Sequence, residues 1–115
     1  MAESKLYVVV RSDLSPGQQA VQACHAALAL AESGVAVPDT LVLLAVPDEP
    51  ALLQLADRIA LGCALPCGYR LQLEVFCEPD LGGQATALAT DEEAARPLLR
   101  DLPLALTPCF HAKSA

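Results

Sequence analysis

Aromatic side chains are scarce in this chain of 115 residues. They make up 3% of it and tryptophan is absent, whereas hydrophobic residues make up 54%. Ala, Leu and Val must therefore fill the core, which suits thin and closely packed layers. The length is that of one domain with a real core, and we expect a single domain over residues 1–115.

Positive charge is also scarce. Seven Lys and Arg residues stand against fourteen Asp and Glu residues, which gives a net charge of -7. Broad phosphate-binding surfaces use clustered Lys and Arg, so the composition argues against a large nucleic-acid interface. The basic residues are scattered along the sequence, which leaves room only for a small local site.

Long apolar segments are absent as well. No run of about 18 apolar residues is free of charge and proline, so we expect no membrane-spanning helix. The first residues, MAESKLYVVVR, lack the positive region that precedes the apolar part of a signal peptide. We therefore expect a cytoplasmic location.

The cysteines are odd in number, and without a secretory signal this favours free thiols. They are Cys24, Cys63, Cys67, Cys77 and Cys109. Cys63 and Cys67 lack a second ligand pair at zinc-site spacing, so we expect neither a metal nor another cofactor. We expect Cys24 to be inert in the core and Cys67, in a loop, to react faster.

Hydrophobic periodicity and turn residues predict the order β-α-β-α-β-β-α. A loop too short for a crossover helix joins the last two strands, so we expect a mixed four-stranded sheet in a small α/β sandwich. Residues from about 103 onward resemble a loosely ordered tail. The expected strands are 5–11, 40–46, 70–77 and 84–90, and the expected helices are 16–33, 50–61 and 91–100.

One of the two histidines lies in the first expected helix. At about 100° per residue, His25 shares a face with Gln18 and Gln22. We expect His25 at the edge of the packed region, with the two amides toward the helix N-terminus, where α/β folds gather ligands. A partly buried histidine that holds a backbone carbonyl is the alternative. The core face of the helix is expected to consist of Ala20, Val21, Cys24, Ala27, Leu28 and Ala31.

The remaining side of this helix carries Ala23, Ala26 and Leu30. It is too apolar for a fully solvated surface. Either a second layer of the same chain or a second subunit must cover it, and we expect a homodimer.

Two familiar catalytic signatures are missing. No G-x-S-x-G motif occurs, so a Ser-His-Asp triad is not expected. The segment PGQQ has a single glycine and EPDLGG has no lysine, so neither predicts a phosphate-binding loop.

The segment VVVRSDLSPGQQAVQACHAAL resembles the opening of the type II peptidyl-tRNA hydrolases. There, a strand ending in Val-Val-Arg-x-Asp-Leu precedes a helix with a Gln-Cys-x-His-Ala-like motif. Gln22, His25 and Ala26 fit that spacing, and Cys24 lies one place later than the family cysteine. VLLAVPDEPALLQLADRI and EPDLGGQATALAT resemble later parts of the family, so the resemblance covers about residues 5–105.

The resemblance implies a compact three-layer α/β/α fold, a homodimer, and metal-independent hydrolysis of the ester that joins a peptide to the tRNA 3′ end. His25 matches the family histidine, Asp80 or Glu78 matches the acid after the third strand, and Thr86 is the nearest match to a threonine of that region. The chain departs from the family at PGQQ, which lacks the two lysines of a Gly-Lys-Gly-Lys-like stretch. It also departs at LGGQA, which replaces a longer Thr-Gln-Ile-Ala-Pro-Gly stretch.

Two functions of different classes are therefore considered. In an ester hydrolase, His25 would take a proton from water, Asp80 or Glu78 would orient the imidazole, and Gln22 with backbone N–H groups of LGGQ would hold the oxyanion. In the alternative, the missing lysines and the negative charge indicate a catalytically silent dimeric relative that acts as a binding or regulatory module. The residues expected to bind substrate are Arg11, Asp13, Gln18, Gln22 and Gly83.

Overall fold

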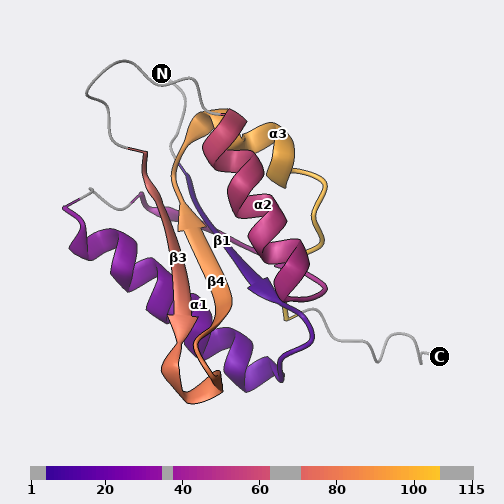
Figure 1. Cartoon of the computed structure of the whole chain (residues 1–115). Coiled ribbons are helices and arrows are strands. Elements are labelled where there is room, and N and C mark those ends of the chain that lie inside the picture. Colours follow the sequence, from indigo (N-terminus) through magenta and orange to yellow (C-terminus); the bar gives the residue numbers. More distant parts are fainter. Residues whose placement is uncertain (1–4, 35–37, 63–70, 107–115) are drawn as a thin grey trace.

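The computed structural model describes residues 5–34, 38–62 and 71–106 of the chain (Figure 1). Within them, strands and helices follow one another in the predicted order, and two short 3-10 helices are added. The elements are β1 (Lys5–Arg11), α1 (Pro16–Glu32), β2 (Thr40–Val46), α2 (Glu49–Gly62), β3 (Leu73–Glu78), η1 (Pro79–Leu81), β4 (Gln84–Thr90), η2 (Glu93–Ala95) and α3 (Arg96–Leu99).

The four strands form one mixed sheet, as predicted. Their order is β2-β1-β4-β3. β1 is parallel to β2, because α1 carries the chain back to the end of the sheet where β1 starts. β4 is antiparallel to both β1 and β3. The central position of β1 explains why Tyr7 to Val10 are all buried.

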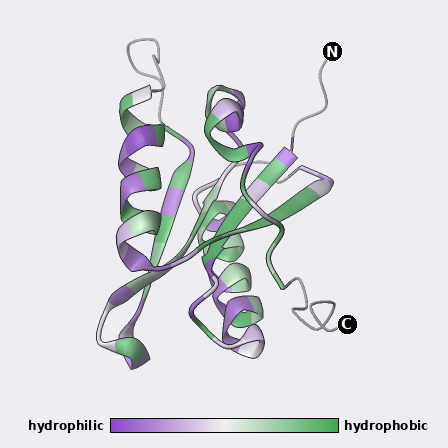
Figure 2. Cartoon of the chain, turned by 90° about the vertical axis from the view of Figure 1, so that its right-hand side faces the viewer, coloured by the Kyte–Doolittle hydropathy of each residue, from purple (hydrophilic) through white to green (hydrophobic). Residues whose placement is uncertain are grey.

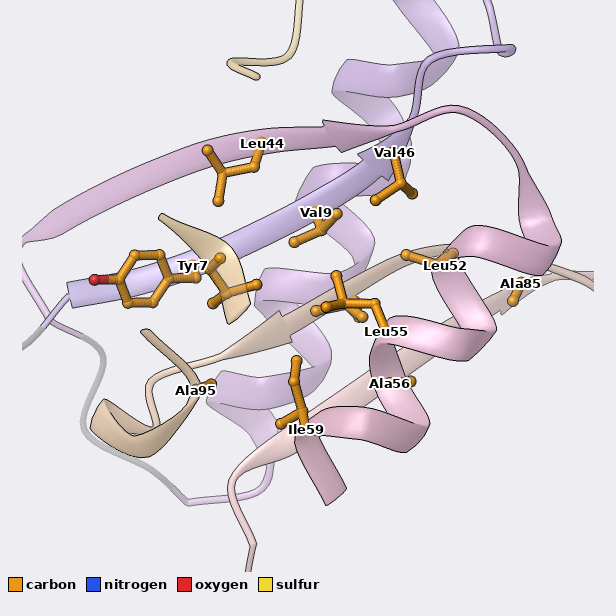
Figure 3. Close-up of a cluster of buried hydrophobic side chains, with 12 residues drawn as sticks. Tyr7, Val9, Leu44, Val46, Leu52, Leu55, Ala56, Ile59, Ala85 and Ala95 are labelled. Carbon is orange, nitrogen blue, oxygen red and sulfur yellow. The ribbon is translucent and has the colours of Figure 1, made fainter. Parts of the chain in front are cut away.

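Helices cover both faces of the sheet, which gives the three layers α1, sheet, and α2 with α3. Alternate side chains of β1 point to opposite faces. Tyr7 and Val9 belong to the core that α2 and α3 cover (Figure 3), whereas Val8 and Val10 belong to the core that α1 covers. The side view in Figure 2 shows helices on either side of largely hydrophobic strands.

Local signals set the ends of α1. Ser15 is the N-cap, and its hydroxyl accepts a hydrogen bond from the backbone N–H of Gln18 at 3.2 Å. Pro16 occupies the first helical position, where no backbone donor is needed. The helix ends at Glu32, and Gly34 follows with a φ of 94°, a conformation that suits glycine.

The face of α1 that meets the sheet is not the predicted one. The buried side chains are Gln19, Gln22, Ala23, Ala26 and Leu30. Of the residues predicted for the core, Ala27 and Ala31 are half-buried, and the other four are exposed. Among them, Val21 is 48% exposed, Leu28 is 61% exposed, and Cys24 is also exposed.

The apolar side of α1 that predicted a homodimer is covered within the chain itself. Ala23, Ala26 and Leu30 pack in the same core as Val8 and Val10 of β1, so the chain's own sheet covers them. The prediction failed because both sides of α1 are apolar, and periodicity alone does not choose between them.

The segment after α3 also differs from its prediction. The backbone N–H of Ala45 donates to the carbonyl of Pro103, and the N–H of Ala105 donates to the carbonyl of Leu43, both at 3.0 Å. The expectation of a loosely ordered tail is therefore wrong for 103–105, which pair with the edge strand β2 through an antiparallel bridge. Residues 107–115 lie outside the described residues.

The last expected helix, 91–100, is broken into two short pieces. η2 spans Glu93–Ala95 and α3 spans only Arg96–Leu99, with Pro97 in its first turn. Proline removes a backbone donor, which suits the start of a helix and not its interior. Across the described ranges, no helix has the length and apolar character needed to cross a membrane.

Candidate functional site

His25 lies where α1 passes the end of β3. Its side chain is 44% exposed, and Nε2 is 4.0 Å from Oε1 of Glu78. The imidazole stacks on the ring of Phe76, with 4.7 Å between centroids and 14° between planes. One face of the imidazole is thus held by an aromatic ring and one edge is turned toward a carboxylate, while part of the ring reaches solvent.

Glu78 is anchored through both of its carboxylate oxygens. Oε1 accepts a hydrogen bond from Nε2 of Gln22 at 2.9 Å, and Oε2 accepts one from the backbone N–H of Asp80 at 3.2 Å. Both hydrogen bonds lower the pKa of Glu78 below its ordinary value, and the bond from Gln22 has the larger effect. Glu78 is therefore a carboxylate at neutral pH.

Gln22 links Glu78 to the buried sheet. It is 1% exposed, and its Oε1 accepts a 2.7 Å hydrogen bond from the hydroxyl of Thr86, which is fully buried on β4. Its Nε2 donates to Gln18 at 3.1 Å as well as to Glu78. Both amide hydrogens and the amide oxygen are thus used, as expected for a buried polar group.

The structure brings one of the two candidate acids to the histidine. Glu78 adjoins His25, whereas Asp80 contributes its backbone N–H to Glu78 and carries an exposed side chain on η1. Thr86 does not reach the surface, so it can position Gln22 but cannot touch a substrate.

The glycines of the β3–β4 turn do not present free amides. Gly82 and Gly83 have φ angles of 71° and 78°, which only glycine adopts readily. The N–H of Gly83 donates to the carbonyl of Glu78 at 3.0 Å, and that of Gly82 donates to the carbonyl of Pro79 at 3.2 Å. These two groups close the turn, so they do not form the oxyanion site expected from LGGQ.

Arg11 is turned inward. It is 7% exposed, and its guanidinium donates to both carboxylate oxygens of Asp13, to Oε1 of Gln84 and to the carbonyl of Ala85, at 2.8–3.1 Å. The hydrogen bond from Arg11 lowers the pKa of Asp13. This arrangement ties the end of β1 to the start of β4. The geometry therefore does not support the expected role of Arg11 in binding substrate.

Gln18 differs from Gln22 in being exposed. Its Oε1 accepts from Gln22, but its amide nitrogen has no hydrogen-bond partner among the described residues. It lies on the same face of α1 as Gln22 and His25, two turns before the histidine. Of the predicted binding residues, Gln18 is the one whose donors are available to a bound molecule.

Phe76 is the site residue that sequence reasoning missed. It stands two residues before Glu78 near the end of β3. Residues two apart in a strand point to the same face, so this spacing could have indicated Phe76 as a neighbour of Glu78. A shift in strand register falls between Phe76 and Cys77, however, and no sequence pattern indicates it.

The cysteines require one correction. Cys24 and Cys77 are free and exposed, so the predicted place of Cys24 in the core is wrong. Cys63, Cys67 and Cys109 lie outside the described residues. Within the described ranges, no three His, Cys, Asp or Glu side chains are grouped so that they could hold a metal ion.

Comparison of the whole chain with protein-family models finds no match, and no curated protein sequence matches it either.

Proposed function

We propose that this protein is a metal-independent carboxylic ester hydrolase in which His25 is the general base. The observation that carries the proposal is the placement of His25 and Glu78, a half-exposed imidazole 4.0 Å from a doubly anchored carboxylate. Histidine titrates near neutral pH, and a fixed carboxylate that orients the imidazole is a common arrangement in hydrolysis. Peptidyl-tRNA is the substrate class that the sequence resemblance implies.

The reaction can be written with the residues at hand. Glu78 orients the imidazole through Nε2, and the other ring nitrogen takes a proton from water as its oxygen attacks the ester carbonyl. The amide of Gln18 can donate to the oxyanion that forms. When the intermediate collapses, the bond from the carbonyl carbon to the alcohol oxygen breaks, and the imidazolium returns its proton to that oxygen.

Charge restricts how an RNA substrate could be held. The chain has a net charge of -7, and the guanidinium of Arg11 is used within the fold. We therefore expect contact with the terminal nucleotide only, and few phosphates. The affinity should then fall less steeply with salt than for a protein that neutralises many phosphates.

The test is release of peptide from a generic peptidyl-tRNA by the purified protein. His25→Ala should lower turnover by about 10² to 10⁴, the usual contribution of one general base. Cys24→Ala, a neighbouring exposed position on α1, is the matched control and should keep turnover within about twofold. Because His25 is half-exposed, the melting temperature of H25A should stay close to that of the wild type.

Two results would contradict the proposal. One is a wild-type protein that releases no peptide and also cleaves no small activated acyl ester. The other is an H25A variant with wild-type turnover. If the protein cleaves only the small ester, the proposed ester hydrolysis is supported, and peptidyl-tRNA is ruled out as its substrate.

A second candidate is a dimeric binding or regulatory module, and a different surface favours it. The outer face of α1 is formed by Ala20, Val21, Cys24 and Leu28, all of them exposed, and no charged residue occurs in α1 before Glu32. Exposed apolar surface of this kind is typical of interaction sites. In a chain of net charge -7, an uncharged face is also one on which two copies meet with little repulsion.

Leu28→Glu tests this candidate. The substitution puts a charge into the apolar face, so sedimentation should show a shift from dimer to monomer. Leu53→Glu is the matched control, because Leu53 is also exposed, at 43%, but lies on α2. A wild type that is monomeric at high concentration would rule out the dimer.

A further inference from the structure

A hollow lies at the other end of the sheet from His25. It has a volume of about 380 Å³ and is lined by the start of β1, by part of β2, by α3 and by the residues that follow α3. Tyr7, which lines it, belongs to the core on the α2 and α3 face, whereas α1 with His25 covers the opposite face. The hollow therefore shares no residue with the candidate active site.

Positive charge gathers around this hollow. Lys5, Arg96 and Arg100 line it, and they are three of the five Lys and Arg residues in the described ranges. Lys5 is far from Arg96 and Arg100 in the sequence, and the fold brings it beside them. In a chain with a net charge of -7, such a concentration on one small surface points to an anion.

Two of these cations are not used within the described part of the fold. Arg96 is engaged, since it donates to the hydroxyl of Tyr7 at 3.0 Å and to Glu93 at 3.1 Å. Lys5 and Arg100 form no ion pair with any described acid. Their charges are thus available to a bound group, while Glu93 offsets part of the charge of Arg96.

Apart from the three cations, the residues that line the hollow are apolar, with Tyr7 adding one hydroxyl. Val42, Leu44 and Leu99 line it together with Tyr7, which is only 6% exposed. The Tyr7 oxygen accepts from Arg96, and its O–H has no hydrogen-bond acceptor among the described residues, so it remains a donor. A volume of about 380 Å³ falls at the lower end of the range of small-molecule sites.

We propose that this hollow binds a small amphipathic anion. Its oxyanion head, a carboxylate or a phosphate ester, would be held by Lys5, Arg100 and the hydroxyl of Tyr7, which Arg96 contacts. Its short aliphatic part would lie on the leucine and valine side chains. Charge-assisted hydrogen bonds supply the selectivity for an anion, and apolar burial supplies the selectivity for a tail.

Calorimetric titration of the full chain tests this with four probes. Sodium octanoate and octyl phosphate carry both features, octylammonium carries the tail with the opposite charge, and inorganic phosphate carries a head without a tail. At least one of the two octyl anions should bind with one site per chain, and the tighter of them identifies the head. Octylammonium should not bind, and inorganic phosphate should bind at least tenfold more weakly than the tighter octyl anion.

Variants locate the site. Lys5→Gln and Arg100→Gln should each weaken binding of the better octyl anion by about tenfold, the order expected for one charge-assisted hydrogen bond at a partly exposed site. Tyr7→Phe should weaken it by a smaller factor. Arg58→Gln is the matched control, since it removes the same charge from the exposed side of α2, and it should leave the affinity unchanged.

Three results would contradict an anion site in this hollow. The proposal is overturned if neither octyl anion binds at millimolar concentration, or if octylammonium binds as well as they do. Equal weakening by Arg58→Gln would show only a general charge effect and would also overturn it. Lys5 is partly exposed and Arg100 is exposed, so both variants should melt as the wild type does, and a melting curve checks this before each titration.

Discussion

The hydroxyl of Thr86 is the buried end of the hydrogen-bonded chain that holds Glu78 beside His25. Thr86→Val keeps the shape of the side chain but removes the 2.7 Å hydrogen bond to Oε1 of Gln22. Gln22 is 1% exposed, so water does not readily replace the lost donor. An unsatisfied buried acceptor costs about 1–3 kcal/mol, and we expect the free energy of unfolding to fall by that amount.

A double-mutant cycle separates this hydrogen bond from simple repacking. Gln22→Leu removes the acceptor while keeping a similar volume. In that background Thr86→Val should cost close to nothing, because no amide oxygen remains to be left unpaired. Urea unfolding of the wild type, both single variants and the double variant gives the coupling energy. Equal costs of Thr86→Val in the two backgrounds, to within about 0.5 kcal/mol, would refute the relay from Thr86 to Gln22.

The same variant should change the titration of Glu78. Its pKa is lowered chiefly by the hydrogen bond from Gln22, so loosening Gln22 should move that pKa back toward the ordinary value. Because the folded-state pKa is below the unfolded one, the stabilising contribution of Glu78 is complete above the ordinary pKa. It is lost as pH falls through the lowered value. Carboxyl NMR titration should therefore show a higher Glu78 pKa in T86V, and an unchanged pKa would contradict this reasoning.

Three further outcomes follow from the contacts described above. Burial and, to a smaller extent, the charge of Glu92 raise the pKa of Asp91, so its carboxylate opposes folding at neutral pH. Asp91→Asn should raise the melting temperature at pH 7, and this gain should vanish below the ordinary carboxyl pKa, where aspartate is neutral in both states. Arg11→Met should lower the free energy of unfolding in urea by about 1–3 kcal/mol, since it removes the buried charge-assisted hydrogen bond to the carbonyl of Ala85. Cys24 should be alkylated in the folded protein, as mass mapping can show, and protection at high protein concentration would indicate a covered α1 face.

The elements of this fold could be predicted closely because their signals are local. β1, β2 and β4 have the expected bounds, since each is a short apolar run between turn residues or charges. The two 3-10 helices and the shortened α3 were missed. A 3-10 turn needs only a few residues, and its side chains carry no periodicity that a sequence window could detect.

The site could be predicted only in the part that belongs to one helix. The spacing of Gln18, Gln22 and His25 placed them on one face of α1. Glu78 meets that face because β3 lies beside β4 at the edge of the sheet, and no local pattern encodes this pairing. The choice between Glu78 and Asp80 could not be made for the same reason, since it depends on where the irregular end of β3 directs each side chain.

The orientation of α1 connects the site to the exposed apolar face. A helical wheel ranks side chains by polarity alone, so it turns Gln19 and Gln22 outward. The structure buries both: Nε2 of Gln19 donates to the carbonyl of Leu14, although its Oε1 has no partner among the described residues, and Nε2 of Gln22 donates to Glu78. A buried amide is tolerated once it is hydrogen-bonded. Turning these amides inward necessarily turns Val21 and Leu28 outward, so the contact that anchors Glu78 and the apolar surface of α1 are consequences of one rotation of the helix.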